Sequence, residues 1–318
     1  MQKNLRIKNF PISFFSIVMG LTGFSISLQK GIEILHLSSI LPNFFLYFAI
    51  SVFFVLTISY IRKICLFPSL IKAEFFHPIK INFFPTFSIS ILLFSVAFLN
   101  INLTISKYLC LVGMILHLIF SIFIISIWIQ HKFAITHMNP SWFIPAVGNI
   151  LIPVTAVTHF PLEISYFFFS VGFFFWGILL VVFFYRIFFH EPLAEKLLPT
   201  LFILIAPPSI GFIAYFKLSA EVNDFGKILY YFALFLTILM FSQIKMFTKI
   251  KYYLSWWAYS FPLAAISIAS ALMYHTSKAY IFKSIYLTLL LILTIVIAIL
   301  IIKTLTYIRN KKICIEEE

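Results

Sequence analysis

The sequence predicts an all-α integral membrane protein with ten transmembrane helices, and three observations support this fold class. The chain has 318 residues, of which 62% are hydrophobic and 10% charged, with a mean hydropathy of +1.07. Soluble domains carry about 25% charged residues, and a water-soluble fold has no way to cover this much apolar surface. The apolar residues also fall into ten runs of roughly 20 residues, the length of a helix that crosses a bilayer. Thirdly, prolines occur in alternate runs.

The ten runs follow one another with short connections, so consecutive helices are expected to be antiparallel neighbours in five hairpins. No soluble domain interrupts them, and residues 1–318 are therefore expected to form a single membrane domain with short tails. "SISLQKG" at the end of the first run offers no small-x-small cleavage site, so this run is expected to be a retained helix rather than a signal peptide. The runs are Phe10–Leu28, Pro42–Ile61, Phe83–Asn100, Tyr108–Trp128, Trp142–Thr158, Ile164–Tyr185, Leu197–Phe216, Ile228–Phe247, Tyr253–Tyr274 and Ile281–Ile302.

Prolines distinguish the odd runs from the even ones. Among even runs only the second has a proline, Pro42, at the first turn, where proline is tolerated. A proline inside a helix removes a backbone hydrogen bond, and in hydrocarbon such backbone survives only against protein or a water-filled cavity. We therefore expect an inner ring of five kinked helices around a pore and an outer ring of five straighter ones. The predicted kink prolines are Pro85, Pro145, Pro153, Pro199 and Pro207, with Pro262 in the ninth run.

Small and polar residues also gather in the odd runs, near these prolines. They are interpreted as candidates for lining the pore, because hydroxyl and amide groups donate hydrogen bonds to a passing anion. The alternative, that they are contacts between closely packed helices, remains open for each of them. The pore-lining candidates are Ser13, Ser16, Thr86, Asn149, Ser209 and Ser260.

The predicted pathway contains no fixed charge. No Asp, Glu, Lys or Arg lies in the middle of a run, and His117 in the fourth run is the single ionisable exception, interpreted as a packing residue. Proton-coupled pumps usually carry ionisable residues within their spans, and voltage sensors carry an arginine ladder, which is absent here. A neutral pathway with backbone dipoles at broken helices favours passive passage of small anions.

Lys and Arg are distributed unequally between the two sides of the membrane. The two tails and the even-to-odd connections hold 17 of the 23, and the odd-to-even connections hold six. The positive-inside rule then places both termini in the cytoplasm of a cell membrane, either plasma or bacterial inner. It also explains the net charge of +13 without nucleic acid as a partner. Lys80 and Arg186 lie near cytoplasmic helix ends, where they either concentrate anions or anchor at lipid headgroups.

A membrane enzyme is an alternative interpretation from another class of protein. It would need His, Cys, Asp or Glu clustered at one membrane face, and "HKFAITH" and "HEPLAE" come nearest. Their spacing matches no metal motif, and Cys65, Cys110 and Cys314 suggest neither a disulfide nor a metal site. The sequence therefore predicts no enzyme, no metal and no cofactor. The residues considered are His131, His137, His190, Glu191 and Glu195.

Four segments together resemble the tellurite-resistance/dicarboxylate transporter family, which includes TehA-like proteins, fungal malate permeases and plant slow-type guard-cell anion channels. They are "HPIKINFFPTFSISILLF", "NPSWFIPAVGNILIP", "HEPLAEKLLPTLFILIAPPSIGF" and "SWWAYSFPLAAISIA", and the resemblance covers essentially the whole chain. It implies a homotrimer with one pore per protomer, occluded by a phenylalanine of the ninth helix that matches Phe261. It leaves open whether the protein is an anion channel, a coupled malate carrier or an exporter of a toxic oxyanion such as tellurite or sulfite.

Phe261 and Pro262 together form the predicted gate. Pro262 is expected to free the carbonyl of Ala258 and bend the ninth helix, and the residue before a proline is steered away from helical geometry. Both effects are expected to aim the Phe261 ring across the pore, where it blocks ions by bulk and by excluding water. The competing interpretation is that Phe261, one of 42 phenylalanines, simply packs.

Overall fold

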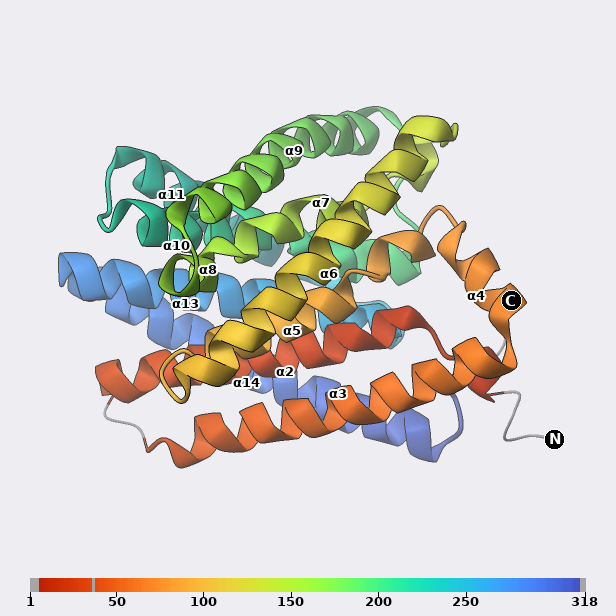
Figure 1. Ribbon diagram of the computed structural model, residues 1–318, viewed down its shortest axis with the longest axis horizontal. Helices are drawn as coiled ribbons and strands as arrows, with labels where there is room; N and C mark the ends of the chain where they lie inside the picture. Colours follow the sequence, from red (N-terminus) through yellow and green to blue (C-terminus); the bar gives the residue numbers. More distant parts are fainter. Residues whose placement is uncertain (1–5, 36–37, 315–318) are drawn as a thin grey trace.

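The computed structural model describes residues 6–35 and 38–314, and within these residues every regular element is helical (Figure 1). Ten helical spans are long and apolar enough to cross a membrane, as predicted. The five even spans are each a single α-helix, and most extend beyond the predicted run at both ends. They are α3 (Ile40–Leu66), α6 (Leu103–Gln130), α9 (Leu162–Phe189), α11 (Asp224–Ser242) and α14 (Tyr280–Arg309).

The five odd spans are divided into 3₁₀ and α segments. The first is η1 (Ile12–Phe14) with α2 (Phe15–Leu35), and the third is η2 (Lys80–Phe83) with α5 (Thr86–Phe98). The fifth has four parts: η4 (Pro140–Trp142), α7 (Phe143–Val147), η5 (Gly148–Leu151) and α8 (Pro153–His159). The seventh is η6 (Glu195–Ile205) with α10 (Ala206–Ser219), and the ninth is η7 (Leu254–Tyr259) with α13 (Ser260–Ser277).

Between residues 10 and 314, leaving out residues 36 and 37, three short helices lie outside the spans: α4 (Pro68–Phe75), η3 (Ile135–His137) and α12 (Ile244–Thr248). The last of these corrects the eighth predicted run, which was expected to continue to Phe247. Instead α11 ends at Ser242, and Gln243 separates it from α12. The break falls at the polar residues Ser242 and Gln243.

The connections within each pair of spans are tight, which confirms the five hairpins. Ala220 and Lys278 adopt left-handed conformations directly after α10 and α13, a common way to end a helix and turn the chain. In two of the hairpins an asparagine caps the outer helix: Asn102 caps α6 and Asn223 caps α11, accepting hydrogen bonds from the N–H groups of Ile105 and Gly226. All the longer connections lie at the other end of the bundle, the end at which the described chain begins and finishes (Figure 1). We call it the termini end.

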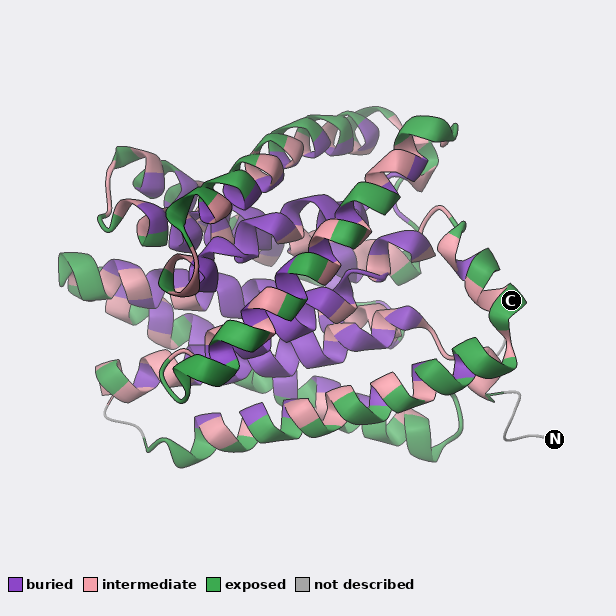
Figure 2. Cartoon of the chain, in the orientation of Figure 1, coloured by how far each residue is buried: buried purple, intermediate pink, exposed green. Residues whose placement is uncertain are grey.

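Burial separates the odd spans from the even ones. Between 72% and 83% of the residues in the most apolar window of each odd span are buried, against 28% to 39% in the even spans. Figure 2 shows the even helices exposed along their outer sides around a buried interior. The exposed residues of the even helices are mainly large and apolar, as lipid contact requires. The odd spans are therefore the inner helices of the fold, and the even ones the outer helices.

Each inner span contacts two other inner spans, and together these contacts form a closed circuit, which is compatible with the predicted ring. The helix α2 contacts α5 and α13, α13 contacts α10, α10 contacts α8, and α8 contacts α5. Each outer helix packs on the inner span of its own hairpin: α3 on α2, α6 on α5, α9 on α7 and α8, α11 on α10, and α14 on α13.

The predicted kink prolines divide the inner spans rather than bend continuous α-helices. Pro85 precedes α5, and Pro153 and Pro207 are the first and second residues of α8 and α10. Pro145 is the third residue of α7, and Pro199 lies inside η6. Apart from Pro199, each proline occupies the N-cap or first turn of an α segment, where its missing N–H would have had no intrahelical partner.

A buried ion pair joins an inner span to an outer helix at the termini end. The ammonium of Lys63 on α3 lies 2.7 Å from a carboxylate oxygen of Glu74 on α4, and both side chains are almost fully enclosed. Glu74 also accepts hydrogen bonds from the Tyr60 hydroxyl and from the N–H of Ile12, the first residue of η1. Lys63 donates a second bond to the carbonyl of Phe10. The beginning of the first inner span is therefore fixed to α3 and α4.

Candidate functional site

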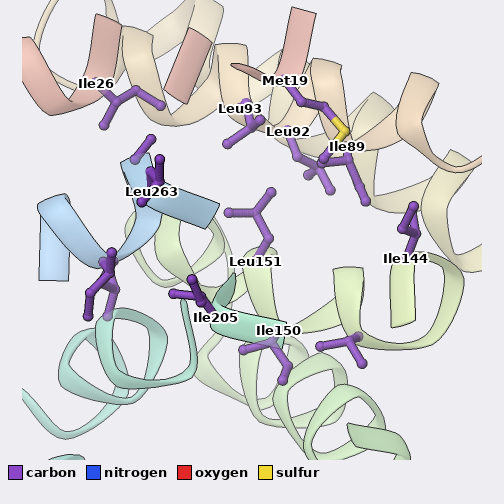
Figure 3. Packing of buried hydrophobic residues seen from close by; sticks show 14 of the residues in the cluster. Met19, Ile26, Ile89, Leu92, Leu93, Ile144, Ile150, Leu151, Ile205 and Leu263 are labelled. Carbon is purple, nitrogen blue, oxygen red and sulfur yellow. The ribbon is translucent and has the colours of Figure 1, made fainter. Parts of the chain in front are cut away.

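A small cavity of about 40 Å³ lies between the inner spans, and all five contribute to its wall. Three of its residues, Ile26, Leu93 and Leu151, approach the same central region from three different segments in Figure 3. Every side chain that lines it is apolar. The lining residues are Ile26, Leu93, Val96, Leu151, Val154, Ile210, Ile213, Phe261, Ala265 and Ile268.

Phe261, the residue predicted to form the gate, is part of this wall. It lies beside Gly23 of α2, where a Cβ atom would stand 3.4 Å from Cδ2 of the Phe261 ring. Its backbone is α-helical, because Phe261 is the second residue of α13. This differs from the expectation that Pro262 steers it away from helical geometry. The irregular backbone lies one turn earlier, in η7.

Close contact between α2 and α13 determines where Phe261 lies. A Cβ atom on Gly20 would stand 2.1 Å from Oγ and 2.8 Å from Cβ of Ser260, so the helices touch there only because residue 20 is glycine. Trp257 in η7 is anchored from the other side, since its indole N–H donates to the Thr304 hydroxyl of α14 over 3.0 Å. Gly20 and Thr304 thus position Phe261. Gly20 is one of the small residues that gather in the first run, whereas nothing in the sequence indicates Thr304.

None of the six predicted pore-lining residues is in the cavity wall, and most use their hydroxyl hydrogens on their own backbone. Ser16 donates to the carbonyl of Ser13, Thr86 to that of Phe83, Ser209 to that of Ile205 and Ser260 to that of Trp257. These carbonyls lie where 3₁₀ and α segments meet, so the hydroxyls satisfy acceptors that the change of helix type leaves exposed. Ser13 and Ser16 remain half-buried, whereas the other four candidates are buried.

Asn149 belongs to a second polar group, between α6 and the fifth inner span. Its amide donates to the Ser121 hydroxyl over 3.1 Å, and Ser121 donates to the carbonyl of Pro145 over 2.6 Å. His117, one turn away on α6, lies 3.0 Å from the Ser88 hydroxyl through its Nδ1 atom. Asn149 therefore points toward an outer helix, and His117 packs as predicted. Ser88 is one of the small and polar residues that gather in the third run, whereas Ser121 was missed, because a lone serine in an apolar run has no distinctive signal.

The two basic residues expected at the cytoplasmic mouth lie in different environments. Lys80 is half-buried in η2, whereas Arg186 is only 3% exposed, on the inward side of α9 one turn from its end. The residues considered for an enzyme site remain dispersed. Within residues 6–35 and 38–314, no three His, Cys, Asp or Glu side chains lie close enough together to hold a metal ion.

The interior of this cavity is unfavourable for water and for ions. A buried water needs two to four polar partners, and the lining side chains supply none. An ion entering such a space loses its hydration without replacement, which costs far more than thermal energy. Apolar constrictions in channels exclude ions in this way.

Comparison with known proteins agrees with this architecture. The family model described as "Voltage-dependent anion channel" (SLAC1) matches residues 9–305. This chain belongs to the voltage-dependent anion channel family. The match includes all five inner spans and all but the last four residues of α14.

Proteins from three different organisms are similar to the chain. An uncharacterized transporter of Methanocaldococcus jannaschii is 30% identical over 94% of this chain and 93% of its own length. The guard cell S-type anion channel SLAC1 of Arabidopsis thaliana is 25% identical over 94% of this chain, but only 56% of its own length. The tellurite resistance protein TehA homolog of Haemophilus influenzae is 23% identical over 90% of each chain. The family resemblance expected from the four quoted segments is thus confirmed.

Proposed function

We propose that this protein is a membrane channel for small anions, and that Phe261 closes its pore. The observation that carries the proposal is that Phe261 stands in the wall of a central apolar cavity to which all five inner spans contribute. Family membership and the plant relatives named as anion channels support the choice of anions. The absence of acidic side chains from the cavity wall supports it as well, since a ring of carboxylates would favour cations.

The first test is the current carried by purified protein in planar bilayers under a chloride gradient. Replacing Phe261 with Ala removes its ring from the cavity wall, and we expect conductance to rise by at least roughly tenfold, equivalent to about 1.4 kcal/mol of barrier. Phe261→Leu should give an intermediate increase. Phe174→Ala serves as the matched control, because Phe174 is 70% exposed on the outer helix α9. Unchanged current from a correctly folded Phe261→Ala protein would remove the gate from the proposal.

The same recordings distinguish a channel from a coupled malate carrier or an oxyanion exporter. A channel passes anions down their own electrochemical gradient, so the reversal potential should follow chloride and be unaffected by proton or sodium gradients. Among the predicted pore-lining residues, Ser13 and Ser16 are the ones with accessible side chains. We expect the Ser13→Ala, Ser16→Ala double variant to alter the relative permeability of nitrate, chloride and malate.

The proposed assembly is a homotrimer in a cell membrane, with one pore in each protomer and both termini in the cytoplasm. The excess of Lys and Arg in the tails and at the termini end supports this orientation. The trimer follows only from the family resemblance. Mass measurement of the protein in detergent tests the trimer, and the accessibility of Cys314 to a membrane-impermeant thiol reagent from each side tests the orientation.

A further inference from the structure

The outer helices α6 and α9 leave a groove between them on the lipid-facing side of the protein. It has a volume of about 400 Å³, within the range of about 300–1,000 Å³ typical of small-molecule sites. Its apolar lining comes from two turns of α6 and two turns of α9. The residues are Met114, Ile115 and Leu118 from α6, with Ile164, Phe167 and Phe168 from α9.

One charged residue, Glu163, also lines this groove. It is exposed and lies in the first turn of α9, so its carboxylate stands at the hairpin end of the groove. Along the same end, the Ser106 hydroxyl of α6 lies 2.8 Å from Nε2 of His159, the last residue of α8. Lys107, the next residue of α6 and also exposed, therefore lies toward the same hairpin end. An acidic group in the groove and a basic group toward its hairpin end are thus available to a headgroup.

We propose that this groove binds one phospholipid with a primary amine in its headgroup, phosphatidylethanolamine. An acyl chain lies along the apolar residues, the ammonium group meets the Glu163 carboxylate, and the phosphate meets the Lys107 ammonium. The bilayer supplies the ligand, since Ile115 and Phe167 are 49% and 52% exposed on the surface that faces hydrocarbon. The charges select the headgroup: phosphatidylglycerol has no cation for Glu163, and the methylated choline of phosphatidylcholine cannot donate a hydrogen bond to it.

The groove lies beside the most divided inner span. Both α6 and α9 pack on α7, η5 and α8, and the two outer helices are held apart at the groove. A lipid seated there completes the cover of this span, whose interrupted backbone is the least able to face hydrocarbon unprotected. The amount of bound phosphatidylethanolamine should therefore affect the stability of the fifth span, independently of how the pore opens.

The test is native mass spectrometry of the purified full-length chain after exchange into equal mixtures of phosphatidylethanolamine and phosphatidylglycerol. The wild type should retain a phosphatidylethanolamine adduct, and Glu163→Gln should lower its occupancy by roughly two- to fivefold, the range for one exposed ion pair. Glu33→Gln is the matched control, because Glu33 is an exposed acidic residue at the end of α2 in the same half of the protein.

A second variant, Leu118→Trp, fills the groove and should reduce binding of every phospholipid, whereas Ile122→Trp one turn along α6 should not.

Three outcomes would overturn the proposal. One is equal phosphatidylethanolamine occupancy in wild type and Glu163→Gln, and another is a preference for phosphatidylglycerol. The third is a second copy of this chain in the groove, detected as a disulfide between Ile115→Cys and Phe167→Cys on different chains. Each readout is a binding measurement in the absence of current, so failure here is distinguishable from failure of the anion channel proposal.

Discussion

Within each hairpin the two helices differ in construction, although both are long and apolar enough to cross a membrane. The outer helix is one uninterrupted α-helix of 19 to 30 residues with a wide apolar surface toward lipid. The inner span changes between 3₁₀ and α geometry, in most hairpins close to a proline, and is largely buried. The difference shows that irregular backbone in this fold depends on protein cover and on nearby hydroxyl donors, whereas regular backbone tolerates direct lipid contact.

Glu74 offers the strongest test of this comparison, since it joins the first inner span to an outer helix. In Glu74→Gln the Lys63 ammonium stays buried without its counter-charge, and we expect a loss of about 3–5 kcal/mol in the free energy of unfolding. The measurement is reversible unfolding in detergent micelles. The control is Asp224→Asn, which breaks an exposed pair with Lys227 and should cost at most about 0.5 kcal/mol.

Removing both charges at once keeps that test informative if Glu74→Gln fails to fold. The double variant Lys63→Met, Glu74→Leu has no unpaired charge and should recover most of the lost stability. If the double variant is as unstable as Glu74→Gln, then the hydrogen bonds of Glu74 with Ile12 and Tyr60, rather than the ion pair, fix the beginning of the first inner span to α3 and α4.

Gly20 tests the contact between two inner helices. Gly20→Ala puts a methyl group against Ser260 Oγ and Cβ, at 2.1 and 2.8 Å, so α2 and α13 must move apart. Overpacking of this kind costs about 1–3 kcal/mol. The additional change Ser260→Gly removes both clashing atoms but also the hydroxyl that donates to the Trp257 carbonyl, so it should restore part of the lost stability. An unaltered melting temperature in Gly20→Ala alone would show that these inner helices are packed more loosely than the structure indicates.

The sequence predicted the ten spans and the inner and outer helices because both follow from local features. The length of an apolar run reflects the thickness of the bilayer. Prolines such as Pro153 and Pro207 interrupt an α-helix through their own local chemistry, whatever the rest of the fold. The cavity wall was not predictable in this way, since Ile26, Leu93 and Ile210 are aliphatic residues like many others in the chain. Phe261 was found through family resemblance rather than through its own pattern.

The hydroxyl residues show a different limit of sequence reasoning. Ser209 and Ser260 stand near prolines because the backbone there needs donors, and this requirement has the same sequence signature as pore lining. The pairing of Lys63 with Glu74 was also not predicted. Whether two charges eleven residues apart meet depends on the turn between α3 and α4, which hydropathy does not report.

A substitution at Gly177 tests the other half of the comparison, the exposed surface of an outer helix. It lies exposed in the middle of α9, and a Cβ atom there would meet no other atom within 4 Å. We expect Gly177→Ala to raise the free energy of unfolding by about 0.5–1 kcal/mol, because alanine is the better helix former. The sign is opposite to that of Gly20→Ala, and the same unfolding assay measures both. A destabilised Gly177→Ala protein would mean that this surface packs against another protein chain rather than lipid.

The smallest expected effect concerns a hydrogen bond between inner helices. The hydroxyls of Ser27 on α2 and Ser267 on α13 lie 2.8 Å apart, fully buried. Such bonds average about 0.6 kcal/mol in membrane proteins, because each partner finds a substitute when the other is removed. In Ser267→Ala, Ser27 is able to donate to a carbonyl of its own helix, as Ser209 and Ser270 already do. We therefore expect a loss near that average. A loss above about 2 kcal/mol would show that Ser27 has no substitute partner and that its hydroxyl is left unsatisfied.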